Sequence, residues 1–159
     1  MSDIDMKKFE ILVSVIAGSK SDSDILKKVT DTLKEFEIPY ETKIFSAHRS
    51  PYMLENYINT CPAQVFIAIA GLSAALPGVI ASKTLKPTIG VPACAALGGL
   101  DSLLSIVQMP PGISVGCVGI ENGVNAALLA VQILAIFNNQ LTEKLKSYRE
   151  KNRKRYEWA

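Results

Sequence analysis

Residues 15–28 read VIAGSKSDSDILKK, and the character of the sequence changes twice within this stretch. The apolar run that ends at Ala17 predicts a strand, and the pattern that begins near Asp24 predicts a helix. The turn between them combines Gly18 with several serines, so it is rich in small hydrogen-bond donors. A strand that passes through a short turn into a helix predicts a βα unit, and hence an α/β fold.

The same alternation continues along the chain. We expect strands at residues 11–17, 40–45, 65–70, 88–91 and 115–120, and helices at residues 23–36, 51–60, 74–83, 100–109, 124–137 and 142–156. The first, third and fifth strands are apolar almost throughout, which is expected of parallel strands that are covered on both faces. The pattern therefore predicts a three-layer, doubly wound parallel sheet with an extra C-terminal helix.

Composition limits the class of protein. The chain has 159 residues, 48% of them hydrophobic, which suits a single domain over residues 1–159. A net charge of +2 gives no reason to expect binding to nucleic acid or to a membrane surface. The first residues are polar where a signal peptide would be apolar, and Cys61, Cys94 and Cys117 are widely spaced. We therefore expect a cytoplasmic protein, and with a single histidine we expect no metal site.

Three further segments have more than one possible interpretation. Residues 65–82 carry no charge, but the glycines and Pro77 within them favour a strand, a tight loop and a helix over a membrane span. The helix expected at 100–109 carries an apolar stripe of Leu100, Leu103, Leu104 and Val107. Such a stripe is typical of core or of a subunit interface. The basic stretch at 144–155 is better explained as a solvated helix end than as a nucleic-acid site.

The loop after the first strand reads GSKSD at residues 18–22. In a doubly wound sheet, ligands bind beyond the carboxyl ends of the strands, so this loop is a candidate binding site. Glycine allows close approach of a ligand, and serine hydroxyls beside a helix start suit a phosphate. The alternative is that Ser21, Asp22 and Ser23 only cap the helix. The loop matches neither the Walker A nor the GxGxxG pattern.

The next two loops differ in chemistry. Residues 46–51 read SAHRSP and contain the only histidine, His48, beside Arg49, a side chain suited to phosphate. The alternative there is a surface histidine next to a solvated arginine. Residues 70–78 read AGLSAALPG, which has no titratable side chain. This third loop could form a close-fitting wall that excludes water, or it could be an ordinary tight turn.

Together with GLDSLLSIVQMP at residues 99–110, these loops resemble the catalytic subunit of phosphoribosylaminoimidazole carboxylase. The motifs occur in order and with matching spacing over about residues 11–149. The usual bacterial form of that family is N5-carboxyaminoimidazole ribonucleotide mutase, an isomerase of de novo purine biosynthesis. The resemblance implies a flavodoxin-like fold, a homo-octamer, a small-molecule ribonucleotide substrate, and catalysis without a metal or an organic cofactor.

The resemblance also implies roles for residues. His48 matches the proton-transfer histidine of the family, and Ser19, Asp22 and Arg49 match substrate-binding positions. The expected substrate-binding set also contains Ser21, Ser46, Ala47, Ala70, Gly71 and Leu76. Arg49 and the amides of the first loop would hold the 5′-phosphate. Asp22 would repel a phosphate, so its expected partner is a ribose hydroxyl.

The chain departs from the family pattern in the third loop. Leu72 stands where the usual mutase has a glycine, and Ala75 stands where it has a second histidine. These departures leave the carboxyl donor open, so the main alternative is a lyase that carboxylates aminoimidazole ribonucleotide directly with carbon dioxide. A lower-ranked alternative is a non-catalytic flavodoxin-like nucleotide-binding or signalling domain. A receiver domain would need a phosphorylatable aspartate at the position that Ala70 and Gly71 occupy.

Overall fold

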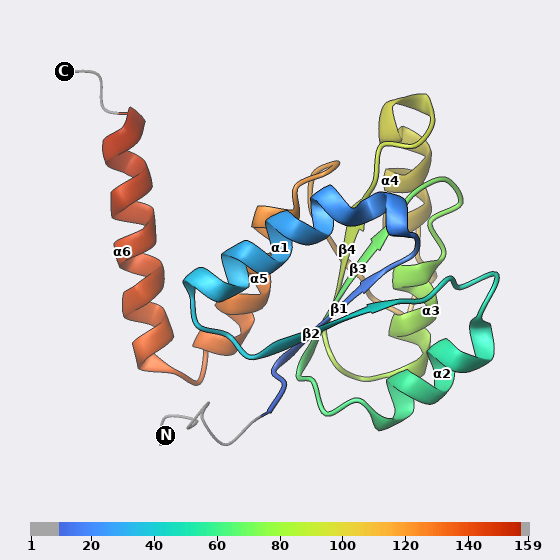
Figure 1. Cartoon of the computed structure of the whole chain (residues 1–159), viewed down its shortest axis with the longest axis horizontal. Coiled ribbons are helices and arrows are strands. Elements are labelled where there is room, and N and C mark those ends of the chain that lie inside the picture. Colours follow the sequence, from blue (N-terminus) through green and yellow to red (C-terminus); the bar gives the residue numbers. More distant parts are fainter. Residues whose placement is uncertain (1–9, 157–159) are drawn as a thin grey trace.

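The structure is a computed structural model, and it describes residues 10–156. Over these residues, five parallel strands form one sheet in the order β2–β1–β3–β4–β5 (Figure 1). The strands are β1 (Val13–Ala17), β2 (Tyr40–Ile44), β3 (Val65–Ala70), β4 (Thr88–Pro92) and β5 (Gly116–Cys117). The helices are α1 (Ser23–Glu35), α2 (Pro51–Thr60), α3 (Leu76–Lys83), α4 (Leu100–Val107), α5 (Gly123–Ala135) and α6 (Asn139–Tyr156). Two short 3-10 helices, η2 (Lys20–Asp22) and η3 (Leu97–Gly99), precede α1 and α4.

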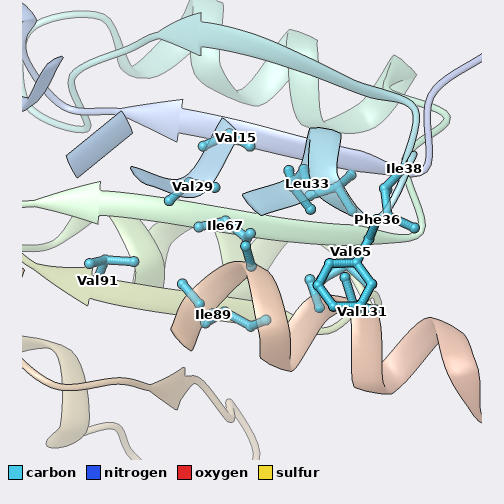
Figure 2. Packing of buried hydrophobic residues seen from close by; sticks show 14 of the residues in the cluster. Val15, Val29, Leu33, Phe36, Ile38, Val65, Ile67, Ile89, Val91 and Val131 are labelled. Atoms are coloured by element: carbon cyan, nitrogen blue, oxygen red, sulfur yellow. The ribbon is translucent and has the colours of Figure 1, made fainter. Parts of the chain in front are cut away.

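The helices cover both faces of the sheet because the central strands are apolar on both sides. Alternate side chains of a strand point to opposite faces. On one face, Val65 and Ile67 of β3 join a core with α1 and α5 (Figure 2). On the other face, Phe66 and Ala68 join a core with α2, α3 and α4. This arrangement confirms the predicted three-layer, doubly wound parallel sheet.

The order of the strands creates a switch point beside β1. The chain passes from β1 to β2 on one side and then returns to β3 on the other side of β1. Loops that leave β1 and β3 therefore diverge to opposite faces, and the crevice between them is where α/β sheets bind ligands. The loops after β1, β2 and β3 lie at this edge of the sheet.

The fifth strand is shorter than predicted. It covers only Gly116–Cys117, whereas residues 115–120 were expected, and it is not buried on both faces. The chain leaves the sheet after Val118 because it turns at Gly119, whose carbonyl accepts from the amide of Asn122. The Asn122 side chain then caps α5 by accepting from the amide of Asn125. Turn and cap chemistry therefore ends the strand early.

Two other predictions needed correction. In α4, Ser102 and Ile106 are buried, whereas Leu100, Leu104 and Val107 are exposed. Of the two interpretations of this stripe, core of the chain is therefore wrong for these three residues, and a subunit interface stays a prediction. The C-terminal helix α6 begins at Asn139, three residues before the predicted start at Thr142, because the Asn138 side chain accepts from the amide of Leu141.

The C-terminal helix stands beside the C-terminal ends of α5 and α1 (Figure 1). A few apolar side chains hold it there. Leu141 is fully buried. The ring centroids of Tyr148 and Phe36 lie 5.3 Å apart. Lys144 forms an ion pair with Glu37, at the end of α1. Over residues 10–156, none of the helices combines the length and the apolar character that crossing a membrane requires.

Candidate active site

The first loop continues directly from the sheet. The amide of Gly18 donates to the carbonyl of Ile69 at 2.9 Å, which extends the pairing of β1 with β3. Ser19 then caps η2: its Oγ accepts from the amide of Ser21, and its own amide donates to Asp22 Oδ2 at 3.0 Å. This capping box fixes the loop, but it is not the cap that was considered from the sequence: Ser19 and Asp22 form it on η2, and Asp22, the N-cap of α1, makes no side-chain capping bond to that helix.

The capping box also decides which donors remain for a ligand. The amides of Ser19, Ser21 and Asp22 already have acceptors within the loop. The hydroxyl of Ser21 donates to Asp22 Oδ1 at 3.3 Å. The Ser19 hydroxyl accepts a bond, and its own proton can still be donated outward. A serine hydroxyl is therefore a better candidate donor here than these amides, which had been expected to grip a phosphate.

Burial changes the acidity of Asp22. The carboxyl group is partly withdrawn from water, and this desolvation raises its pKa above the ordinary value. The hydrogen bonds from the Ser19 amide and the Ser21 hydroxyl act in the opposite direction, because they favour the charged form. The net effect is a raised pKa, so the carboxylate would gain from a further hydrogen-bond donor such as a ligand hydroxyl.

The second loop is a tight turn held by two serines. Ser46 Oγ accepts from the amide of Arg49 at 3.2 Å, and Ser50 Oγ accepts from the amide of Ser46 at 3.0 Å. The turn leaves His48 and Arg49 exposed at its tip. Pro51 occupies the first turn of α2, as the sequence predicted. One guanidinium nitrogen of Arg49 donates to the carbonyl of Gly18 at 3.3 Å, so the second loop contacts the first.

A partly buried polar contact anchors the helix that follows this loop. The hydroxyl of Tyr57 in α2 donates to Glu41 of β2 and lies 2.7 Å from the hydroxyl of Ser14 in β1. Burial, together with hydrogen bonds to Cys61 and Glu41, raises the pKa of Tyr57, which therefore stays neutral and remains a donor. The contact fixes α2 against the strands and so fixes the exit of the second loop.

The third loop forms consecutive tight turns before α3. The amide of Ala74 donates to the carbonyl of Leu72 at 2.8 Å, and the amide of Ala75 donates to the carbonyl of Ser73 at 2.6 Å. The helix had been predicted to begin at Ala74. Because of these turns, α3 begins at Leu76. Gly71 is packed closely, because a Cβ there would lie 3.1 Å from the Cβ of Ala95.

The three loops enclose one cavity of about 570 Å³ at the carboxyl ends of β1, β2 and β3. Every residue predicted for the site lines it: His48, Arg49, Ser19, Ser21, Asp22, Ser46, Ala47, Ala70, Gly71 and Leu76. The lining also includes residues outside the predicted set, namely Gly18, Leu72, Ser73, Ala74, Ala75 and Ala95. Most of these belong to the loops already singled out, but Ala95 follows β4 and has no functional group that could have identified it.

A larger cavity of about 740 Å³ lies elsewhere and is lined by residues 81–89 and 112–114 and by Gly116, Leu129 and Ile133. It is at the opposite end of the sheet, where β4 and β5 begin. Of the described residues that line it, none is an acid or a histidine. Position and chemistry therefore favour the smaller cavity as the candidate active site, although it is not the largest.

Comparison with known proteins shows what the chain is similar to. The family model described as AIR carboxylase matches residues 12–155. The N5-carboxyaminoimidazole ribonucleotide mutase of Methanocaldococcus jannaschii is 52% identical over 144 residues, which cover 91% of this chain and 92% of that protein. The protein of the same name from Pyrococcus abyssi is 53% identical over 142 residues, with 87% and 82% covered. The crystal structure of Treponema denticola PurE is 34% identical, with a TM-score of 0.80 and 91% and 92% covered.

Proposed function

The chain belongs to the AIR carboxylase family, and from this premise we propose that it is an isomerase of de novo purine biosynthesis. It converts N5-carboxyaminoimidazole ribonucleotide to 4-carboxy-5-aminoimidazole ribonucleotide. The observation that carries the proposal is the cavity in which separate loops bring together His48, Arg49 and Asp22. An imidazole, a guanidinium and a carboxylate can supply proton transfer, phosphate binding and hydroxyl binding for a ribonucleotide.

The reaction needs no net oxidation or added group. The bond between the carboxylate carbon and the exocyclic nitrogen breaks, carbon dioxide leaves, and the nitrogen keeps the electron pair and takes a proton. Ring carbon C4 then attacks carbon dioxide, a carbon–carbon bond forms, and C4 loses its surplus proton. One group that gives the first proton and takes the second is sufficient, and His48 is the only imidazole in the chain.

The other loops hold the substrate around this histidine. Arg49 presents a planar fork of donors that matches a phosphate, and the Ser19 hydroxyl adds a further donor in the same cavity. Asp22 accepts from a ribose hydroxyl, which compensates the carboxylate for its partial burial. The small, uncharged residues of the third loop face the reacting ring and limit its contact with water.

We also propose that this single catalytic domain acts as a homo-octamer in the cytoplasm. The number of subunits comes from the family resemblance alone. Support for subunit contacts comes from Leu100, Leu104 and Val107, which expose an apolar face of α4 to solvent in the isolated chain. A contiguous exposed apolar face is typical of an interaction surface.

The deciding assay offers two substrates separately to the purified protein. One reaction contains the N5-carboxylated ribonucleotide, and the other contains aminoimidazole ribonucleotide with bicarbonate. The proposal expects fast formation of the C4-carboxylated product from the first and slow formation from the second. Ready use of bicarbonate with no conversion of the N5-carboxylated substrate would replace the mutase proposal by direct carboxylation.

A further inference from the structure

Leu72 has an unusual backbone conformation at the cavity. Its φ is 56°, in the left-handed region that glycine adopts freely and that a side chain makes costly. Among residues 10–156, the other non-glycine residues with positive φ are Glu37, Leu97 and Glu121, and none of these lines the cavity. Glycine would therefore adopt the backbone conformation of this position at a lower energetic cost than leucine does.

Packing within the chain does not explain this leucine either. Leu72 is 56% exposed, whereas Leu76, the other leucine of the cavity lining, is 2% exposed. Leu76 therefore belongs to the apolar core, and Leu72 lies at the solvent side of the same wall. An exposed apolar side chain in a strained conformation adds little to the stability of the fold. It is available to contact a ligand.

The loop holds Leu72 on a rigid support. The carbonyl of Leu72 accepts from the amide of Ala74, so the residue is fixed within a tight turn. Gly71, directly before it, packs closely against Ala95, whose Cβ would lie 3.1 Å from a Cβ at position 71. Apart from the buried Leu76, the other residues of this loop that line the cavity are small, so Leu72 is the large apolar group on its solvent side.

We propose that Leu72 covers carbon dioxide during its transfer, an inference that rests on the proposed function. Carbon dioxide is uncharged and has no proton to donate, so the cavity cannot hold it by strong hydrogen bonds. Its capture by C4 competes with escape to water. An apolar side chain over the mouth slows escape and takes no part in breaking the carbon–nitrogen bond, forming the carbon–carbon bond or moving the proton.

The experiment measures how much of the carboxylate is retained. The substrate carries a ¹³C-labelled N5-carboxylate, and the buffer contains unlabelled bicarbonate. Product mass then separates carboxylate that was transferred within the cavity from carboxylate that escaped, and aminoimidazole ribonucleotide that accumulates counts as further escape. For Leu72→Gly we expect the escaped fraction to rise about fivefold, which corresponds to about 1 kcal/mol of barrier to escape. Leu72→Met, which restores an apolar cover, should return it close to the wild-type value.

Leu97→Gly is the matched control. Leu97 has a φ of 45° and is also an exposed leucine, but it does not line the cavity. Both glycine variants relieve the same kind of backbone strain, so both should fold with unchanged or raised thermal stability. The escaped fraction should rise in Leu72→Gly alone.

The measurements distinguish a failure of the proposed function from a failure of the covering role. If wild type does not convert the labelled substrate, the proposed function is wrong. If wild type converts it and Leu72→Gly retains as much label as wild type, the proposed function stands and the covering role is wrong. Light scattering provides the last check. If Leu72→Gly dissociates the assembly, Leu72 packs against another subunit, and the covering role is again wrong.

Discussion

Arg49 Nη2 donates a hydrogen bond to the carbonyl oxygen of Gly18 at 3.3 Å, and so joins the loop after β2 to the loop after β1. The bond is long and exposed, and it uses one of the five N–H groups of the guanidinium. Both Arg49 and Ser19 line the same cavity. Arg49 is therefore positioned to bind an anion without a large rearrangement.

Arg49→Ala should weaken binding of the ribonucleotide. The loss of hydrogen bonds to a charged group costs about 1.5–3 kcal/mol, or about ten- to a hundredfold in Kd. The dephosphorylated riboside should bind with nearly unchanged affinity, and Arg49→Lys, which keeps the charge without the fork, should lie between. Calorimetric titration with both ligands checks this. Equal losses for the two ligands would show that Arg49 does not hold the phosphate.

His48→Asn should reduce turnover by about a hundredfold or more, because the amide cannot exchange protons near neutral pH. The side chain is exposed at the tip of a turn held by Ser46 and Ser50, so the substitution should leave the fold intact. Substrate affinity, measured separately, should change little. A variant that kept half of the wild-type rate would remove His48 from the proton transfer.

The sequence predicted the sheet well where one physical signal dominated. Strand β3 is buried on both faces, so its six residues are all apolar and could be recognised without any partner. Strand β5 has no such run, because Gly116 is exposed and the chain turns at Gly119. Its length depends on tertiary hydrogen bonds, which a local pattern does not contain.

The candidate site could likewise be predicted only in part. His48, Arg49 and Asp22 are chemically distinctive, and each follows a predicted strand, so the sequence was enough to bring them to one edge of the sheet. Ala95 could not be predicted, because an alanine contributes only shape. The positive φ of Leu72 was also hidden, since leucine ordinarily indicates nothing about the left-handed region.

Asp22→Asn should affect the free energy of unfolding and the affinity for the ribonucleotide in different ways. Burial raises the pKa of Asp22 in the folded chain, so the folded state binds more protons than the unfolded state between the two pKa values. The free energy of unfolding therefore falls as pH rises through this window. At neutral pH the variant, which needs no ionisation, should be at least as stable as wild type, and this advantage should disappear below the unfolded pKa.

The same variant should bind the ribonucleotide more weakly, because an amide accepts more weakly from a ribose hydroxyl than a carboxylate does. Denaturant unfolding at neutral and acidic pH gives the stability, and titration gives the affinity. Asp24→Asn is a suitable control, since Asp24 is an exposed residue of α1 that does not line the cavity. A wild-type advantage in stability that grows with pH would contradict the assigned direction of the shift.

Leu104→Glu should dissociate the proposed assembly. Leu104 lies on the exposed apolar face of α4 with Leu100 and Val107, and burying a leucine contributes about 1.5–3 kcal/mol. A buried, unpaired carboxylate would cost more. Light scattering over a range of protein concentration should show smaller particles for Leu104→Glu. Lys34→Glu, on the exposed surface of α1, changes charge away from this face and should not alter the mass. A wild-type monomer would contradict the assembly itself.

Ala75→His should increase the preference for the N5-carboxylated substrate over bicarbonate. Ala75 lines the cavity and has ordinary right-handed backbone angles, φ −70° and ψ −20°, so a larger side chain needs no change of backbone. It also precedes the first turn of α3, whose positive dipole end favours a negatively charged carboxylate nearby. An added imidazole donor there would hold the carboxylate of the substrate before transfer.

The gain from one hydrogen bond to a charged group is about 1.5–3 kcal/mol, so the ratio of the two rates should rise about ten- to a hundredfold. Both reactions are measured on wild type and variant, and thermal unfolding verifies that the fold is intact. Ser82→His is a matched control, because Ser82 is an exposed residue of α3 that lies outside the site. The ratio should stay at the wild-type value in this control. If Ala75→His also leaves the ratio unchanged, the wild-type cavity already positions the carboxylate without a second imidazole, and the small wall around Leu72 is sufficient for transfer.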